Sequence, residues 1–550
     1  MKVDPPATAG KGRGRRSVRS KPLVDENRPL SNLDRIVDRI EHAPVIGGMD
    51  AAGSRNPAAS RKTHTAGTKS RAAAEDSNSG KRRPPQRDSL MALTQFCSLW
   101  HTPDQEAFVT FPIRGHRETW AVRSQAFKRW LAARAYEEQG LVPGAQAIED
   151  TLRVLEARAT NEGPERESWL RSGASNGTLY IDLGDPAWRC VAISAGGWEV
   201  LERHSLPFIR SSSMRPLPEP QAGESIGALR GFINAASEED FILAVAWLLV
   251  ALRNTGPYPI LIVNGEQGSG KSTFSRLMRS LVDPNAAPIR AAPREERDLI
   301  VAANNAHVIA IDNLSKVDVW LADALCRIAT GGGFSARQLH TDRDEMVFQA
   351  TKPIILNGIP HLTERADLAD RCVTVRLKAI AEDVRQPEDE FWRAWDDALP
   401  RVLGALFDAL SVAIRNVPTT RLARVGRMAD FEKWIVAAEP AFDWEAGAFQ
   451  TAYRDNRRDA ADSAFAADPV ATAIADLMQT RTEPWIGTAT ELLSAIADFA
   501  SETIKRTRSW PVTAQGLGNR LDRIAPLLRG RGLQIERRHS GVRTVTIAHI

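Results

Sequence analysis

The residues best suited to chemistry lie in a glycine-rich segment between an apolar run and an amphipathic stretch. Residues 265–272 read GEQGSGKS and match the pattern G-x-x-x-x-G-K-[ST] at every fixed position. In this pattern backbone N–H groups wrap phosphates, the lysine reaches the β- and γ-phosphate oxygens, and the hydroxyl binds Mg²⁺. We therefore expect ATP and Mg²⁺ as cofactors, bound by Gly265, Glu266, Gln267, Gly268, Ser269, Gly270, Lys271, Ser272 and Thr273.

The sequence on either side of this loop supports that interpretation. Residues 260–263, ILIV, read as a buried strand, and apolar residues recur at helical spacing after the loop, at Phe274, Leu277, Met278 and Leu281. A strand, a glycine-rich loop and a helix in this order place the helix N-terminus against the bound anion.

A second strand, in HVIAIDNLS, ends on an acidic residue. We expect Asp312 to bind Mg²⁺ together with Ser272. The next residue is Asn313, where many ATPases of this design carry a glutamate that polarises the attacking water. An amide orients water but accepts no proton, so the sequence leaves the catalytic base open. Because phosphoryl transfer depends mainly on positioning and charge stabilisation, turnover remains compatible with Asn313.

Further along the chain, polar residues flank two more apolar strands. KPIILNGI ends on Asn357, which is predicted to contact the γ-phosphate or its water; the alternative is a turn-forming Asn before Gly. TERADLADRCVTVRL places Arg365 and Arg371 before the next strand. In a ring an arginine here stabilises charge on the neighbour's ATP, and in a monomer it is a surface charge. Arg371 is the first choice.

A β-hairpin is predicted between the acidic strand and the Asn357 strand. Ser335–Thr341 and Glu345–Ala350 read as strands joined by DRD, with Arg337, His340 and Arg343 near the tip. A small-molecule kinase has no use for such a basic insertion. In a ring, hairpins of this kind can line the channel and contact a single-stranded phosphate backbone.

The C-terminal region reads as helix, helix and hairpin, the order of a winged helix. Two helices are expected in GTATELLSAIADFASE and TAQGLGNRLDRIAPLLRGRG, each after a threonine cap, followed by strands Leu533–Arg537 and Val542–Ile547. Such a module puts its second helix in the major groove of duplex DNA; the alternative is a subunit-packing domain. The expected DNA contacts are Arg520, Arg523, Arg537, Arg538 and Arg543.

The 550-residue chain has a net charge of only +4, so the position of its basic residues matters more than their number. Four scattered cysteines without a C-x-x-C pair argue against a zinc ribbon or disulfide scaffold. The longest apolar run, Phe241–Leu252, is too short to span a membrane, and the N-terminus lacks the apolar stretch of a signal peptide. These features predict a soluble, cytoplasmic protein without a membrane partner.

Changes in composition divide the chain into six parts of an α/β protein. Residues 1–88 form a basic tail too polar to fold, either solvated or touching nucleic acid. A mixed α/β module at 89–222 includes strands in GTLYIDLGD and WEVLERHSLPFIRS, with the carboxylates of DLGD in a turn rather than a metal site. A helical lead-in at 223–256, the P-loop core at 257–380, a helical lid at 381–465 and the winged helix at 466–550 follow.

In this order the motifs resemble the superfamily 3 helicases of the AAA+ class, as found in primase-helicases of phages, plasmids and integrative elements. ALCRIATGGGFSARQLHTDRDEMVFQATKPIILNGI is similar to ATPases of bacterial mobile elements, and YIDLGDPAWRCVAISAGGWEV and MRPLPEP resemble the module before their motor. The resemblance covers roughly Leu90 to Ile550. It implies a homo-hexamer that moves on single-stranded DNA or melts an origin. Asn313 and the lack of an evident primase domain depart from the pattern.

The sequence therefore predicts an ATP-dependent DNA helicase or translocase for replication of a phage, plasmid or integrative element. Two other classes stay open: a regulatory or defence ATPase that senses nucleic acid, and a nucleotide-dependent DNA-binding protein that does not unwind. A separate primase also remains open as a partner.

Overall fold

The computed structural model describes residues 85–550 except 316, 333, 338–344, 349–350, 359–365, 508 and 541. Residues 82–550 form one compact unit. Nearly all of the predicted basic tail falls outside the described residues, although the first helix already begins at Gln86, before the predicted boundary at 88. Among the helices that the structure describes, none is both long enough and apolar enough to cross a membrane.

The first module contains helices and two antiparallel sheets, which agrees with the predicted mixed α/β character. Helix α2 (Gln86–Leu93) precedes a sheet of order β1-β2-β3, and α3 (Gln125–Gln139) and α4 (Ala145–Asn161) follow it. The strands of this sheet are β1 (Ser98–His101), β2 (Ala107–Ile113) and β3 (His116–Ala121). The second sheet has the order β4-β5-β6-β7, formed by β4 (Ser172–Ser175), β5 (Thr178–Asp182), β6 (Cys190–Ser194) and β7 (Gly197–Leu201).

Two details of this module test the sequence interpretation. The DLGD segment is a turn, as expected, because Gly184 has φ +70° and its N–H donates to Asp182 Oδ1 at 3.0 Å. The strand expected in WEVLERHSLPFIRS is β7 (Gly197–Leu201), which ends at Leu201. Residues beyond it leave the sheet and make one isolated bridge, between Phe208 and Trp169.

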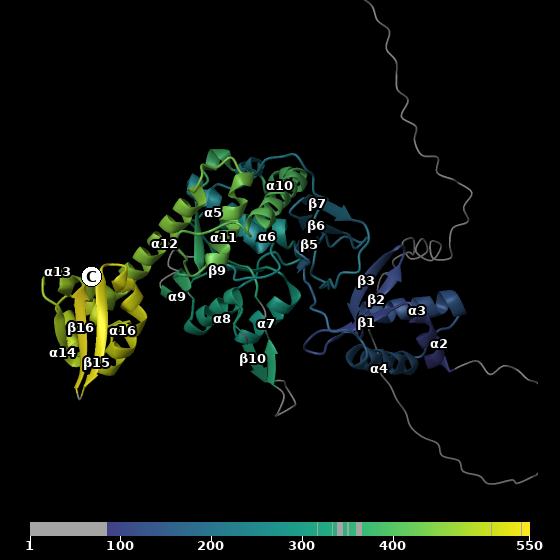
Figure 1. Cartoon of the computed structure of the whole chain (residues 1–550), viewed down its shortest axis with the longest axis horizontal. Coiled ribbons are helices and arrows are strands. Elements are labelled where there is room, and N and C mark those ends of the chain that lie inside the picture. Colours follow the sequence, from purple (N-terminus) through teal and green to yellow (C-terminus); the bar gives the residue numbers. More distant parts are fainter. Residues whose placement is uncertain are drawn as a thin grey trace, which may run out of the picture. The chain divides into compact units, whose positions relative to one another are not determined.

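A four-stranded parallel sheet follows the first module along the chain, and Figure 1 labels one of its strands, β9 (Ile309–Leu314). Its order is β13-β8-β12-β9, and its other strands are β8 (Ile260–Gly265), β12 (Ile354–Gly358) and β13 (Cys372–Leu377). The accompanying helices are α6 (Lys271–Val282), α7 (Glu296–Asn305), α8 (Val319–Thr330) and α9 (Ala366–Ala369). Between α8 and β12, β10 (Phe334–Arg337) pairs antiparallel with β11 (Glu345–Phe348).

Further helices complete the core. They are α5 (Glu238–Ala251), α10 (Glu388–Asn416), α11 (Ala429–Ala438) and α12 (Ala448–Ala467), with short 3-10 helices η1 (Ile226–Gly231), η2 (Glu382–Val384) and η3 (Glu439–Ala441). Helices α5 and α12 pack on β13, and α10 and α11 pack on α5. Helix α5 is buried from Asp240 onward because it is apolar all round. The lead-in was expected to be helical throughout, but it breaks between η1 and α5, where Ala236 N–H donates to Arg376 O at 2.8 Å.

The C-terminal module begins at α13 (Pro469–Gln479). It continues with β14 (Trp485–Thr488), α14 (Ala489–Ala497), α15 (Glu502–Lys505), α16 (Ala514–Arg529), β15 (Leu533–Ser540) and β16 (Val542–His549). Both threonine caps are present: Thr488 forms a capping box with Glu491, and the Thr513 side chain accepts from Gly516 N. The hairpin is longer than predicted, and β14 completes a sheet of order β14-β16-β15.

Candidate nucleotide-binding site

Parallel pairing brings the predicted site residues to one edge of the sheet. Strands β8, β12 and β9 run in the same direction, with Ile355 opposite both Leu261 and Ala310. The carboxyl ends of adjacent parallel strands therefore meet, and ligands of open α/β sheets bind at this edge. The phosphate loop follows β8, Asp312 and Asn313 lie near the end of β9, and Asn357 lies near the end of β12.

The phosphate loop needs its glycines for backbone conformation and space. Gly268 and Gly270 have φ of +81° and +77°, which favour glycine. A Cβ on Gly265 would lie 2.4 Å from Ser269 Oγ and 3.0 Å from Leu377 O. Helix α6 then begins at Lys271 without a side-chain cap, so its first N–H groups are available to an anion.

The two expected Mg²⁺ ligands are in contact. Ser272 Oγ lies 3.1 Å from both Oδ1 and Oδ2 of Asp312, and donates a hydrogen bond to that carboxylate. A hydroxyl and a carboxylate are hard oxygen donors of the kind that Mg²⁺ prefers. These residues are 40 positions apart in sequence, so this contact depends on the tertiary fold.

The loop also contains donors that a polyphosphate would satisfy. Lys271 Nζ donates to Gly265 O at 2.7 Å and to Glu266 O at 2.8 Å, which holds the ammonium over the loop. Ser269 is buried, and its Oγ has no hydrogen-bond partner in the described part of the chain. Buried polar groups usually have partners, so the loop fits a ligand with phosphate oxygens. Glu266, Gln267 and Gly268 are exposed, and Thr273 is half-buried in the first turn of α6.

Asn357 and Asn313 form one hydrogen-bonded unit beside the loop. Asn357 is buried; its Oδ1 accepts from Asn313 N at 2.8 Å, and its Nδ2 donates to Ser275 Oγ at 3.0 Å. Ser275 Oγ in turn donates to Lys271 O at 2.9 Å. Asn357 thus links the Asp312 strand to the helix of the phosphate loop. It is not merely a turn former.

The backbone explains an asparagine at position 313. Asn313 has φ +57°, a left-handed conformation that Asn adopts more readily than most residues. Its side chain is exposed at the site. A glutamate here would carry more backbone strain, which accounts for part of the departure from the usual motif.

Arg371 lies away from the phosphate loop of its own chain. It directly precedes β13, and Cys372 pairs with Ile260 at the start of β8 while Leu377 pairs with Gly265 at its end. Five residues of strand, about 17 Å, separate these positions. Arg371 is half-buried and does not adjoin the phosphate loop of its own chain. Arg365, His340 and Arg343 lie outside the described residues.

The predicted hairpin is confirmed where it is described. Strands β10 and β11 pair antiparallel with Arg337 opposite Glu345, and the remaining residues of the two predicted strands lie outside the described residues. This pairing brings Arg337 to the last described position before the segment that connects the strands.

Sequence reasoning missed three residues that shape the loop. Asn234 Nδ2 donates to Ser269 O at 2.9 Å and to Lys378 O at 2.6 Å, which ties the loop to β13. A Cβ on Gly268 would lie 3.1 Å from Arg385 Nη2, so this exposed guanidinium adjoins the phosphate loop. Ser275 is the third. None belongs to a recognised motif, and only the fold shows their proximity.

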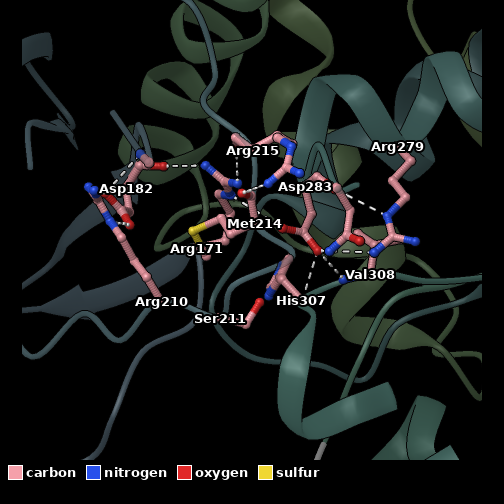
Figure 2. Close-up of polar contacts among 12 residues, drawn as sticks. Arg171, Asp182, Arg210, Ser211, Met214, Arg215, Arg279, Asp283, His307 and Val308 are labelled. Atoms are coloured by element: carbon pink, nitrogen blue, oxygen red, sulfur yellow. Dashed lines mark hydrogen bonds and ion pairs between the residues drawn. The ribbon is translucent and has the colours of Figure 1, made fainter. Parts of the chain in front are cut away.

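The C-terminal end of α6 lies in a buried cluster of charged residues, several of which come from the first module (Figure 2). Arg171 Nε donates to Asp283 Oδ1 at 3.4 Å, and both residues are fully buried. Arg171 also donates to Asp182 O at 2.8 Å and Arg215 O at 2.7 Å. Arg210 pairs with Asp182 at 2.5 Å.

Asp283 is the centre of this cluster. Its Oδ2 accepts from His307 N at 2.9 Å and Val308 N at 3.1 Å. Burial alone would raise the pKa of Asp283, but the charges of Arg171 and Arg279 outweigh it and lower that pKa. Burial lowers the pKa of His307 to about 4, helped by the charge of Lys352. His307 is therefore neutral at pH 7.

The segment after Asp283 links this cluster to the acidic strand of the site. Ala286 N donates to Ser213 O at 2.8 Å, and Arg215 N donates to Pro284 O at 2.9 Å. The same segment then runs beside β9, where Asp312 N donates to Arg290 O at 2.8 Å. The backbone of Asp312 is thus held by a segment that the first module anchors.

Comparison with known proteins identifies two regions of the chain. Residues 226–463 match the family described as actinomycete integrative conjugative element replication protein, and residues 470–550 match the AICE RepA C-terminal domain. These regions contain the parallel sheet with its helices and the C-terminal module. Over residues 226–463 and 470–550 the chain is thus similar to the RepA replication proteins of integrative conjugative elements.

Solved structures show only distant likeness to this chain. The apo A form of the NrS-1 C-terminal region has 12% identity and a TM-score of 0.37, over 84% of this chain and 98% of that chain. A second apo structure of that region has 11% identity and a TM-score of 0.36, over 85% and 100%. JCV helicase with a bound thiazolopyridinyl-phenoxyphenyl acetamide has 14% identity and a TM-score of 0.19, over 37% of this chain and 61% of that chain. These scores carry no conclusion about activity, and no curated protein matches the chain.

The C-terminal module uses some of its predicted DNA-contact arginines internally. Arg520 pairs with Asp468 at 2.8 Å, and Arg537 donates to Gly518 O and to Asp522 at 3.1 Å. Arg523 and Arg543 are exposed, and Arg538 is exposed with a 3.5 Å ion pair to Glu536. Two of the five thus anchor the module, and three face outward.

Proposed function

We propose that this chain is an ATP-dependent DNA helicase or translocase that acts in replication of an integrative conjugative element. The observation that carries the proposal is the Ser272–Asp312 contact, 3.1 Å from the hydroxyl to both carboxylate oxygens, at the N-terminus of α6. Two hard donors beside a glycine-rich loop fit Mg²⁺-bound triphosphate better than any other ligand class. The family match supplies the replication context.

Different residues of the chain have different roles in the proposed hydrolysis. Lys271 and the N–H groups of the loop bind the phosphates, and Ser272 and Asp312 hold Mg²⁺. When bound, Mg²⁺–ATP supplies the phosphoanhydride bond and the cation that neutralises its charge. Asn357 fixes the backbone of Asn313 at 2.8 Å, which places the exposed Asn313 amide where it can orient water.

Subunits of the proposed motor form a ring, a homo-hexamer, with hydrolysis at their interfaces. Arg371 supports this arrangement because it lies at the start of β13, about 17 Å along the strand from its own phosphate loop. In a ring this guanidinium stabilises charge at the neighbour's ATP. Arg365 is the second choice for this role.

The proposed DNA contacts lie in two places. The hairpin of β10 and β11, with Arg337, His340 and Arg343, contacts single-stranded DNA in the channel. The C-terminal module has the element order of a winged helix, with α16 as its second major helix and β15–β16 as its wing, and binds duplex DNA.

One observation favours a second function. Asn313 replaces the residue that would act as base, so a nucleotide-dependent DNA-binding protein that hydrolyses slowly would use the same site. A regulatory or defence ATPase would hydrolyse ATP on DNA without separating strands. Both are outcomes of the experiment below.

The test is a strand-displacement assay with the full chain, run in parallel with DNA-stimulated ATP hydrolysis. The parent should separate a forked duplex with Mg²⁺–ATP, and Asp312→Asn should lose both activities. Asp396→Asn, an exposed carboxylate on α10, is the matched control and should keep both. Hydrolysis without displacement supports the regulatory function, and nucleotide binding without either activity supports the DNA-binding function.

A further inference from the structure

One face of α16 is exposed and carries side chains of types that can recognise base edges. Gln515, Asn519 and Arg523 follow one another at intervals of four residues and are exposed. This spacing puts them on one line along the helix. Within the described part of the chain they make no side-chain hydrogen bond, so their donors and acceptors are available for a ligand.

The opposite side of α16 fixes the helix within its module. Leu517, Leu521, Ile524 and Leu528 are buried in the core of the module. Arg520 pairs with Asp468 at the cap of α13. Arg537 donates from β15 to the carbonyl of Gly518. A helix held from both sides presents its outer face with little freedom, as specific recognition requires.

The charge around this face complements a polyanion. Residues 514–550 contain seven arginines and only two acidic residues, Asp522 and Glu536, each within reach of an arginine. Arg520, Arg531 and Arg537 pair internally, so the outward positive charge comes from Arg523, Arg529 and Arg543, together with the exposed Arg538, which pairs with Glu536. This surface therefore favours a nucleic acid over a second copy of the same basic face.

We infer that Gln515, Asn519 and Arg523 read the base edges of a specific duplex DNA sequence in the major groove. A carboxamide pairs bidentately with adenine and a guanidinium with guanine, which gives each position a base preference. From Gln515 to Arg523 the helix rises about 12 Å, enough to span about three base pairs at 3.4 Å each. Arg538 and Arg543 contact phosphates and add affinity without sequence preference.

This inference rests on the proposed DNA-binding function and names its sequence-reading residues. It differs from the arginine-only expectation, because two uncharged residues provide the discrimination and Arg520 takes no part. Base reading needs no nucleotide, so the experiment is run without ATP and does not depend on hydrolysis.

The experiment selects bound sequences from a pool of duplex oligonucleotides with a randomised centre, using the full chain. The parent should enrich one motif and bind it more tightly than a shuffled duplex. Gln515→Ala/Asn519→Ala should lower that preference about 5- to 150-fold for each lost base contact, with little change on the shuffled duplex. Gln479→Ala, an exposed carboxamide at the end of α13, is the matched control and should keep the preference.

A second variant separates recognition of the base edges from electrostatic attraction to the phosphates. Arg538→Ala should weaken binding to both duplexes by a similar factor and reduce the salt dependence by about one ion. No enrichment by a folded parent would overturn the inference, as would an unchanged motif preference in the Gln515/Asn519 variant. Binding to single-stranded DNA alone, or self-association through this face, would also overturn it. None of these outcomes would contradict the proposed ATP hydrolysis and strand displacement.

Discussion

The phosphate loop and the buried charged cluster lie at opposite ends of the same helix. At its start, Lys271 and Ser272 come from nine consecutive residues and remain accessible to a ligand. At its end, Asp283 is fully buried among residues from distant segments, including Arg171 and His307. We propose that the first region binds the nucleotide and catalyses its hydrolysis. In the second region the charged side chains pair with one another. These contacts hold in place the segments that position the first region.

Both regions also meet at Asp312. Its side chain contacts Ser272, while its backbone N–H donates to Arg290 O in the segment anchored by the cluster. The comparison therefore predicts different consequences: changes in the loop should remove activity from a folded chain, and changes in the cluster should first remove stability.

The largest effect is expected at Arg371. Arg371→Ala should lower ATP turnover about 10³- to 10⁵-fold and spare ATP binding, because only the charge in phosphoryl transfer is lost. Mixing it with inactive Lys271→Ala should restore turnover, since some interfaces then combine an intact loop with an intact Arg371. Arg393→Ala, an exposed residue of α10, is the control. No recovery on mixing would contradict action in trans.

The cluster should respond through stability. Asp283→Asn leaves Arg171 and Arg279 buried without their carboxylate and should cost about 3–5 kcal/mol in the free energy of unfolding. Urea denaturation measures this change. Glu149→Gln, which removes an exposed partner of Arg123, should leave stability unchanged. If both variants changed the free energy of unfolding equally, the buried cluster would be no more important for stability than the surface ion pair.

Lys271→Ala should separate binding from folding. It removes the ammonium that reaches the phosphates and should lower DNA-stimulated hydrolysis by at least about 10²-fold, with an unchanged urea midpoint. Lys128→Ala on α3 is a matched loss of charge outside the site. ATP hydrolysis equal to that of the parent would show that the nucleotide binds elsewhere.

The smallest effect is a pH dependence from His307. Its folded pKa of about 4 lies below the ordinary 6.5, so the unfolded chain binds the proton more readily. Stability is complete above pH 6.5 and is lost as pH falls toward 4, by about 3 kcal/mol. His307→Gln can still donate to Ala251 O but does not titrate. Its stability should therefore fall less over this window, and an unchanged slope would contradict the assignment.

The sequence was sufficient for features set by neighbouring residues. The strand, loop and helix around Lys271 follow from glycine spacing and apolar periodicity, as do both threonine caps of the C-terminal module. Asp312 and Asn357 were placed correctly at strand ends. Their partners were not predictable, because strand order decides that Asn357 lies between β8 and β9 and bonds to Asn313.

The sequence did not predict features that depend on contacts between distant segments. No local pattern marks Arg171, Asp283 or Arg385, since a buried arginine looks like an exposed one in sequence. The same limit affected the C-terminal arginines. Arg520 and Arg523 sit three residues apart on α16, yet one pairs with Asp468 and the other faces outward. Helical period alone does not tell which charges the rest of the fold will use.

The central claim, that Ser272 and Asp312 hold the metal of a bound nucleotide, has a direct test in metal specificity. Ser272→Cys exchanges a hard hydroxyl for a soft thiolate ligand, which binds Mg²⁺ poorly and Mn²⁺ or Cd²⁺ better. The variant should lose DNA-stimulated ATP hydrolysis with Mg²⁺ and regain it with Mn²⁺ or Cd²⁺. Hydrolysis with Mg²⁺ equal to that of the parent, or an equal loss with every metal in a folded protein, would contradict the claim.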